Sequence, residues 1–127
     1  MNRVLVVDDS HVIRRLVEVC LEQIHVDVSS IANGTDACEA LAIGAPDLLI
    51  LDVGLPDMTG WDILDFIRDR NDLDDMAIIM LTGHADTDDV DRAADMGADA
   101  YLLKPFRPAE LRRVVIDTLR RASAAAV

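Results

Sequence analysis

Lysine, aromatic side chains and cysteine are all scarce in this sequence. Lysine occurs once among 12 basic residues, which face 24 acidic ones, so the formal net charge is −12. A surface this acidic repels phosphate backbones and anionic lipid headgroups. Aromatic residues make up 3% of the chain, too few for a platform on which nucleic acid bases could stack. We therefore expect this segment to make no direct contact with nucleic acid.

The two cysteines and the short apolar runs exclude further classes. Cys20 and Cys38 fall in helix-like segments, and we expect free thiols rather than a disulfide. No apolar run approaches the roughly 20 residues that a membrane-spanning helix needs, so we expect no membrane contact. Met1–Arg3 leads directly into a strand-like run without a signal-peptide pattern, which favours a cytoplasmic location.

The sequence does contain a series of short apolar runs. Four of them are continuous, and they are Val4–Val7, Leu48–Leu51, Ile78–Leu81 and Tyr101–Leu103. Continuous runs this short predict strands that are buried on both faces, as in a parallel sheet. A fifth run, Val26–Ile31, partly alternates between apolar and polar residues and predicts a half-exposed edge strand.

Apolar residues at helical spacing separate these strands. The predicted helices cover about Val12–Leu21, Ala37–Ala42, Ile63–Ile67, Thr87–Met96 and Leu111–Leu119. The expected boundary signals are Ser10 as an N-cap, a Thr59–Asp62 capping box, Gly97 at a helix end and Pro108 in a first turn. Five strand–helix units in series predict an α/β fold with a doubly wound, five-stranded parallel sheet and helices on both faces.

The chain length of 127 residues suits a single domain. We place this domain at residues 1–121, and no internal repeat or second domain is visible in the sequence. Residues 122–127 are expected to form a C-terminal tail, which is either the frayed end of the last helix or the stub of a linker.

Polar residues follow four of the predicted strands at the point where each strand ends. They are Asp8 and Asp9, Asp52, Thr82 and Lys104. Ligands of open parallel sheets bind beyond these carboxyl ends, so we expect the five side chains to share one edge. Three clustered carboxylates repel one another, and a hard divalent cation such as Mg²⁺ relieves that conflict. A carboxylate in such a site can attack phosphorus, while a hydroxyl and an ammonium group stabilise the phosphoryl oxygens.

Two of these residues carry most of that argument. Asp8, Asp9 or Thr82 taken singly suits a helix cap or a turn, since aspartate is abundant in this chain. Asp52, in contrast, directly follows a fully apolar strand, and Lys104 is the only lysine beside eleven arginines. A compact ammonium group is not interchangeable with a guanidinium group, so a lone lysine indicates a specific task.

Four stretches together resemble the receiver domain of bacterial two-component response regulators, with a single phosphoacceptor domain like that of the chemotaxis regulators. They are Val4–Ser10, Leu51–Gly60, Leu81–Gly83 and Tyr101–Phe106. The resemblance covers about residues 3–121. It implies the flavodoxin-like (βα)5 receiver fold, with the strand order 2-1-3-4-5.

The resemblance also implies roles for individual residues. Asp52 resembles the phosphoacceptor, and the Mg²⁺ ligands would be Asp8, Asp9, Asp52 and the backbone carbonyl of Gly54, with Asp9 the favoured direct ligand of the acidic pair. Thr82, Lys104 and Tyr101 resemble the catalytic and switch residues of the family. The Lys104–Pro105 bond resembles a cis peptide bond that the family shares.

Several positions depart from common patterns of the family, and two of them bear on dephosphorylation. Gly54 places no side chain two residues beyond the phosphoacceptor, and His84 lies two residues beyond Thr82. These two positions flank the path of the hydrolytic water in the family. We therefore expect Gly54 and His84 to tune the rate of dephosphorylation.

The implied function is a signalling switch rather than an enzyme, although such a domain promotes its own phosphorylation and dephosphorylation. A sensor histidine kinase or a phosphotransfer protein would supply the phosphoryl group to Asp52. The surface of the fourth helix, fifth strand and fifth helix would then change and control a downstream protein partner, or form a homodimer on phosphorylation.

Two other functions use similar residues. A phosphohydrolase with an aspartyl-phosphate intermediate would need a second aspartate two residues after the nucleophile, where this chain has Gly54. A flavodoxin-like mononucleotide-binding module would need a phosphate loop rich in serine, threonine and glycine after the first strand, where this chain has Asp8-Asp9-Ser10. Two carboxylates at that place repel phosphate unless a metal ion intervenes.

Overall fold

The computed structural model describes residues 1–83 and 87–125. Its elements are β1 (Asn2–Val7), α1 (His11–Leu21), β2 (Val26–Ile31), α2 (Gly34–Ile43), β3 (Leu48–Asp52), α3 (Gly60–Arg68), the 3-10 turn η1 (Asn71–Leu73), β4 (Ala77–Thr82), α4 (Thr87–Asp95), β5 (Ala100–Leu103) and α5 (Pro108–Ala125). Over these residues the strands form one parallel sheet of five strands in the order β2-β1-β3-β4-β5. The predicted α/β fold and strand order are confirmed.

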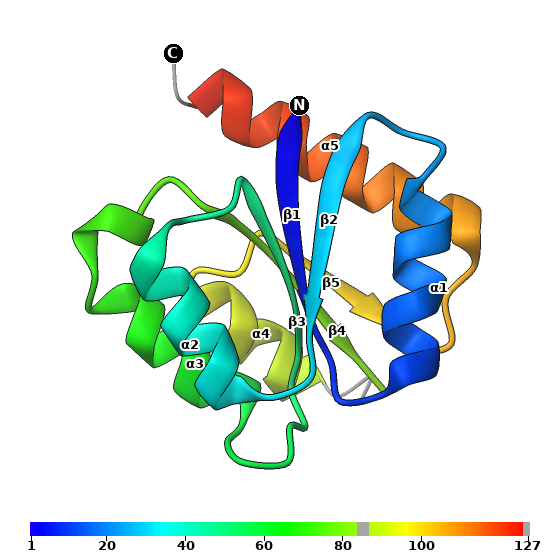
Figure 1. Ribbon diagram of the computed structural model, residues 1–127. Coiled ribbons are helices and arrows are strands. Elements are labelled where there is room, and N and C mark those ends of the chain that lie inside the picture. Colours follow the sequence, from blue (N-terminus) through cyan, green and yellow to red (C-terminus); the bar gives the residue numbers. More distant parts are fainter. Residues whose placement is uncertain (84–86, 126–127) are drawn as a thin grey trace.

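The sheet is covered on both faces, as Figure 1 shows. Helices α1 and α5 pack on one face, while α2, α3 and α4 pack on the other. Every residue of β3 is buried, and the side chains of Leu48–Leu51 alternate between two apolar clusters. Leu49 and Leu51 belong to the cluster under α2 and α3, whereas Leu48 and Ile50 belong to the cluster under α1 and α5. With both faces covered by apolar residues, Leu48–Leu51 has no polar position, which explains the unbroken apolar run before Asp52.

Local hydrogen bonds set several of the helix boundaries that the sequence predicts. The Oγ of Ser10 accepts a hydrogen bond from the N–H of Ile13 and caps α1. Thr59 and Asp62 form the predicted capping box at the start of α3. Pro108 is the first residue of α5, where its missing N–H removes no helical hydrogen bond.

The strand β5 differs from its prediction. The run Tyr101–Leu103 predicted a strand buried on both faces, but Tyr101 is half-buried and Leu103 is 40% exposed. The reason is the place of β5 at the edge of the sheet, where it pairs with β4 alone. The half-exposed edge strand predicted at Val26–Ile31 is confirmed as β2, at the opposite edge.

The C-terminal helix is longer than the predicted segment. Helix α5 continues to Ala125, so residues 122–125 of the expected tail are helical.

The short turn η1 was not predicted. Cys20 and Cys38 are free thiols, as expected. Among the described residues, no helix combines the length and the apolar character that crossing a membrane requires.

Candidate functional site

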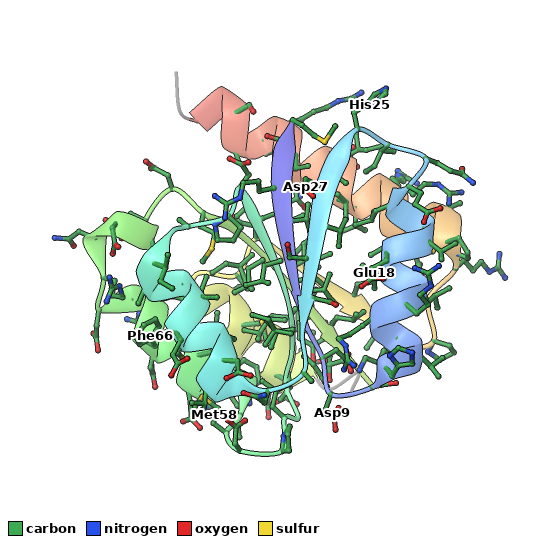
Figure 2. All side chains as sticks on the ribbon, viewed as in Figure 1. Asp9, Glu18, His25, Asp27, Met58 and Phe66 are labelled. Atoms are coloured by element: carbon green, nitrogen blue, oxygen red, sulfur yellow. The ribbon has the colours of Figure 1, made fainter. Side chains whose placement is uncertain are left out.

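The register of β1 and β3 brings two of the predicted carboxylates together. Val7 lies opposite Leu51, so Asp8 and Asp52 lie side by side at the carboxyl edge of the sheet. Both side chains are buried, Asp8 completely and Asp52 with 7% exposure. The third carboxylate, Asp9, is exposed and lies at the lower end of the molecule in Figure 2.

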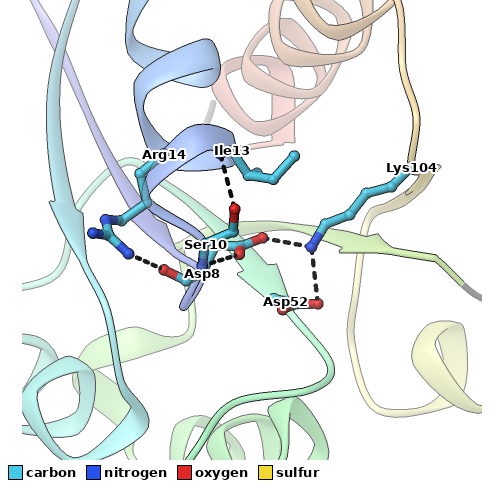
Figure 3. A network of polar contacts seen from close by, with 6 residues as sticks. All are labelled: Asp8, Ser10, Ile13, Arg14, Asp52 and Lys104. Carbon is cyan, nitrogen blue, oxygen red and sulfur yellow. Dashed lines mark hydrogen bonds and ion pairs between the residues drawn. The ribbon is translucent and has the colours of Figure 1, made fainter.

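Lys104 reaches both buried carboxylates from the end of β5. Its backbone N–H donates to the carbonyl of Thr82 at 2.8 Å, which holds the chain beyond β5 against β4. Its Nζ lies 2.7 Å from Asp8 Oδ2 and 3.4 Å from Asp52 Oδ1 (Figure 3). The Lys104–Pro105 peptide bond is cis. One ammonium group thus balances part of the charge of two carboxylates.

Asp8 is held from several directions (Figure 3). The N–H of Ser10 donates to Asp8 Oδ1 at 2.9 Å, and the guanidinium of Arg14 donates to the backbone carbonyl of Asp8 at 2.7 Å. The other carboxylate oxygen, Oδ2, forms the ion pair with Lys104 but accepts no aligned hydrogen bond from any described residue. A buried carboxylate oxygen that is satisfied only by a charge contact is well suited to bind a cation.

The surroundings of Asp52 oppose the charge of its carboxylate and shift its pKa. Burial raises the pKa of the Asp52 carboxyl above its usual range, and the nearby charge of Asp8 raises it further. Lys104 and a hydrogen bond from the backbone of Gly54 lower the same pKa, but they do not reverse the shift. Three carboxylates beside the single ammonium group of Lys104 leave the site with an excess of negative charge.

A metal ion fits this set of donors. Asp8, Asp9 and Asp52 each offer one carboxylate oxygen, and the three oxygens lie within 4.8 Å of one another. Carboxylate and carbonyl oxygens are the ligands that Mg²⁺ prefers, and Mg²⁺ usually retains several waters, for which the exposed Asp9 leaves an open side. The excess negative charge supports the same conclusion, because a divalent cation relieves it.

The other residues predicted for the site, Thr82, Tyr101 and Gly54, differ in how deeply they are buried. Thr82 ends β4 and is 1% exposed, whereas Tyr101 of β5 is half-buried. Gly54 is exposed and lies in the loop between β3 and α3, where it forms an isolated antiparallel bridge with Thr59. His84 lies outside the described residues, so its role in dephosphorylation stays a prediction.

Two residues near the site were missed by the sequence analysis. Arg14 lies one helical turn beyond Ser10 and binds the backbone of Asp8, a role that an arginine in an amphipathic helix does not reveal. Asp57 lies in the loop after β3, and its carboxylate accepts hydrogen bonds from the first turn of α2. No sequence signal connects Asp57 to a helix more than twenty residues earlier.

The chain belongs to the response regulator receiver domain family, whose pattern matches residues 4–116. This membership agrees with the strand order and with the acidic site at the carboxyl edge. The chain is therefore a receiver domain of the kind found in two-component response regulators.

Curated relatives share this segment with the chain. It is 42% identical to the transcriptional regulatory protein GltR of Pseudomonas aeruginosa, over 94% of this chain and 49% of that protein. It is 39% identical to the DNA-binding response regulator MtrA of Mycobacterium tuberculosis, over 94% of this chain and 51% of that protein. The chain thus spans about half the length of the curated relatives that it matches.

Solved structures agree with the fold over almost the whole chain. The signal receiver domain of a putative Luxo repressor protein from Vibrio parahaemolyticus superposes with a TM-score of 0.93 and 31% identity, covering 98% of this chain and 95% of that one. The chemotaxis response regulator CheY4 of Vibrio cholerae gives a TM-score of 0.87 at 30% identity, covering 93% of this chain and 98% of that one.

Proposed function

We propose that this receiver domain is a phosphoacceptor switch that takes a phosphoryl group on Asp52 from a histidine kinase or a phosphotransfer protein. The observation that carries the proposal is the placement of Asp52. Its buried carboxylate lies 3.4 Å from the ammonium group of Lys104 and within the three-carboxylate group formed with Asp8 and Asp9. The family membership favours this function over a phosphohydrolase or a mononucleotide-binding module.

The phosphoryl transfer assigns a task to each residue. A carboxylate oxygen of Asp52 attacks phosphorus, the bond from phosphorus to the donor breaks, and the donor leaves with the bonding electrons. The ammonium group of Lys104 and the hydroxyl of Thr82 then bind phosphoryl oxygens. Asp8, Asp9, Asp52 and the carbonyl of Gly54 would hold Mg²⁺, which would supply positive charge to offset the repulsion between carboxylates and phosphate.

The ion pairs of Lys104 suggest how its contacts would change when Asp52 is phosphorylated. Before transfer, Nζ is shared between Asp8 Oδ2 and Asp52 Oδ1. A phosphoryl group on Asp52 adds charge and new acceptor oxygens beside the same ammonium group. Lys104 would exchange a carboxylate partner for a phosphoryl oxygen, and its backbone hydrogen bond to Thr82 connects this change to the end of β4.

The output surface of the switch is formed by α4, β5 and α5. Helix α4 carries Asp88, Asp89, Asp91 and Asp95, and α5 carries Arg112, Arg113, Arg120 and Arg121. Tyr101 lies between these helices on β5 and is half-buried, so it can turn inward on activation. We expect a downstream protein partner at this surface, with a phosphorylation-dependent homodimer as the alternative.

The chemistry is tested by incubating the protein with Mg²⁺ and a small acyl phosphate and measuring its mass. The wild type should gain one phosphoryl group, and Asp52→Asn should gain none. Lys104→Arg keeps the charge but not the compact ammonium group, so it should retain some labelling and lose the switch. Equal labelling of Asp52→Asn and the wild type would remove Asp52 as the acceptor.

The output surface is tested by sedimentation at low and high salt, with and without a phosphoryl mimic. Association that appears with the mimic and weakens with salt supports the homodimer, because exposed opposite charges are screened. A monomer in all four conditions excludes it and leaves the protein partner. Unchanged partner binding after Arg112 and Arg113 are both changed to Glu would place the output surface elsewhere.

A further inference from the structure

The loop between β3 and α3 is closed tightly at its base. The N–H of Gly60 donates to the carbonyl of Val53 at 2.7 Å, and Gly54 pairs with Thr59 in an antiparallel bridge. A Cβ at Gly60 would lie 2.6 Å from the backbone oxygen of Asp52. The base of the loop is therefore packed directly against the backbone of the proposed phosphoacceptor, with no room for a side chain.

The tip of the same loop is tied to α2 by Asp57. Its Oδ1 accepts a hydrogen bond from the N–H of Gly34 at 2.8 Å. Its Oδ2 accepts from the N–H of Thr35 at 2.8 Å and from the hydroxyl of Thr35 at 2.5 Å. Both carboxylate oxygens are thus occupied by the first turn of a helix, whose positive end also favours an anion.

A packing contact reinforces this connection. A Cβ built at Gly34 would lie 2.2 Å from Cγ of Met58, so the Met58 side chain rests against the backbone at the start of α2. Figure 2 shows Met58 at the same lower end of the molecule as Asp9. The loop tip and the helix end therefore meet through two consecutive residues, Asp57 and Met58.

The strength of the contact shows in the ionisation of Asp57. The hydroxyl of Thr35 and the N–H groups of Gly34 and Thr35 lower the pKa of the Asp57 carboxyl to about 2. The carboxylate is therefore charged throughout the physiological range. It is therefore able to accept these hydrogen bonds at any pH at which the site would bind a cation.

We propose that Asp57 is a positioning residue for the cation and phosphoryl site. Its hydrogen bonds to α2 hold the loop tip, and the closed base passes this restraint to the backbone of Gly54. That backbone already contacts Asp52 through a hydrogen bond, and its carbonyl is a proposed Mg²⁺ ligand. The proposal rests on the proposed function, because it gives the β3–α3 loop a role at the same site.

Mg²⁺ titration with the fluorescence of Trp61 tests the proposal. Trp61 is the only tryptophan in the chain and follows the loop directly, at the start of α3. Asp57→Ala should weaken Mg²⁺ binding about tenfold, the loss typical of a group that orients a metal ligand. Asp57→Asn keeps one acceptor oxygen and should recover part of this loss.

Two control variants separate positioning from other effects. Asn33→Ala removes the N-cap of α2 without touching the loop, so it should lower the melting temperature but leave Mg²⁺ affinity unchanged. Asp36→Asn removes one negative charge from the same helical turn and should change affinity much less than Asp57→Ala. If Asn33→Ala and Asp57→Ala lowered Mg²⁺ affinity equally, Asp57 would act only as a cap of α2, and the proposal would be wrong.

A double mutant tests the named contact itself. Thr35→Val removes the hydroxyl that donates to Asp57 and should weaken Mg²⁺ binding by itself. In the Asp57→Ala background the same change should add nothing, because its partner is already absent. If the losses of Mg²⁺ affinity added up in the double mutant, Thr35 and Asp57 would act separately, which would contradict the proposal.

A metal-free measurement distinguishes failure of the inference from failure of the proposed function. In the protein without Mg²⁺, the amide NMR signal of Gly54 should shift and its hydrogen exchange should accelerate in Asp57→Ala but not in Asn33→Ala. A wild type that binds no Mg²⁺ would refute the metal site, while the Gly54 signal still decides whether Asp57 holds the loop. An unchanged Gly54 signal in Asp57→Ala would refute the inference.

Discussion

Helices α3 and α4 have the same length and cover the same face of the sheet, but they are held very differently. Each has nine residues, all of them within the described part of the chain. Helix α3 buries five of them, namely Gly60, Trp61, Ile63, Leu64 and Ile67. Helix α4 buries Ala93 alone. Helix α3 therefore contributes several side chains to the hydrophobic core, whereas α4 contributes only Ala93.

The ends of the two helices show a similar contrast. Helix α3 begins with a capping box directly after the loop that carries the proposed metal ligand Gly54. Helix α4 ends at Asp95 and is followed by Gly97, whose φ of 99° lies in the left-handed region that glycine adopts without strain. Between the helices, the guanidinium of Arg92 lies 4.4 Å from the ring centre of Trp61. The proposed metal ligand Gly54 thus lies in a loop that leads into a firmly packed helix, while the proposed output surface includes a helix with little buried surface.

The largest expected difference concerns core packing. Leu64 of α3 is fully buried, so Leu64→Ala should lower the free energy of unfolding by about 2–5 kcal/mol. Val90 of α4 is 38% exposed, and Val90→Ala should change the free energy of unfolding by no more than about 0.5 kcal/mol. Urea denaturation of both variants measures the contrast. Similar losses would mean that α4 is held as firmly as α3.

A second variant tests the close approach at the start of α3. Gly60→Ala forces a Cβ to within 2.6 Å of the Asp52 carbonyl oxygen and should cost about 1–3 kcal/mol of stability. Gly44→Ala is the matched control, because its backbone is extended and a Cβ there meets nothing within 4 Å. Thermal unfolding should show a clear loss for the first variant and little change for the second. A stable Gly60→Ala protein would show that the loop base can shift.

The pH dependence of stability probes the site beside α3. Burial and Asp8 raise the pKa of Asp52, so the folded state binds its proton more tightly than the unfolded state does. The carboxylate therefore costs stability as the pH rises above the usual aspartate value of 3.8. In a metal chelator, Asp52→Asn should melt at a higher temperature than the wild type at pH 7, and the difference should close below pH 3.8. A lower melting temperature at pH 7 would contradict the sign of this shift.

The smallest expected effect concerns the contact between the two helices. Arg92→Ala should lower stability by about 0.5–1 kcal/mol, the range of an exposed cation–π contact, and should change the fluorescence of Trp61. Arg70→Ala removes a longer contact, 5.5 Å from the Phe66 ring, and should leave that fluorescence unchanged. Equal fluorescence in the two variants would mean that Trp61 does not report on α4.

Much of the fold could be predicted because its signals are local. The unbroken apolar run at Leu48–Leu51 predicts a strand buried on both faces, and β3 is buried throughout. Ser10 and the Thr59–Asp62 pair predict helix starts, because a cap uses residues that are only three apart. The run Tyr101–Leu103 predicted the wrong burial, since its apolar pattern does not reveal that β5 lies at an edge.

By itself, the sequence determined the elements, their order and the polar residues that end the strands, because periodicity, caps and strand ends are properties of neighbouring residues. The tertiary structure alone decided which of those residues meet. The ion pairs of Lys104 with Asp8 and Asp52 depend on strand register, and the contact of Asp57 with α2 depends on two loops lying side by side. It also decided that α3 is packed and α4 is not, since burial depends on what the rest of the chain places over each helix.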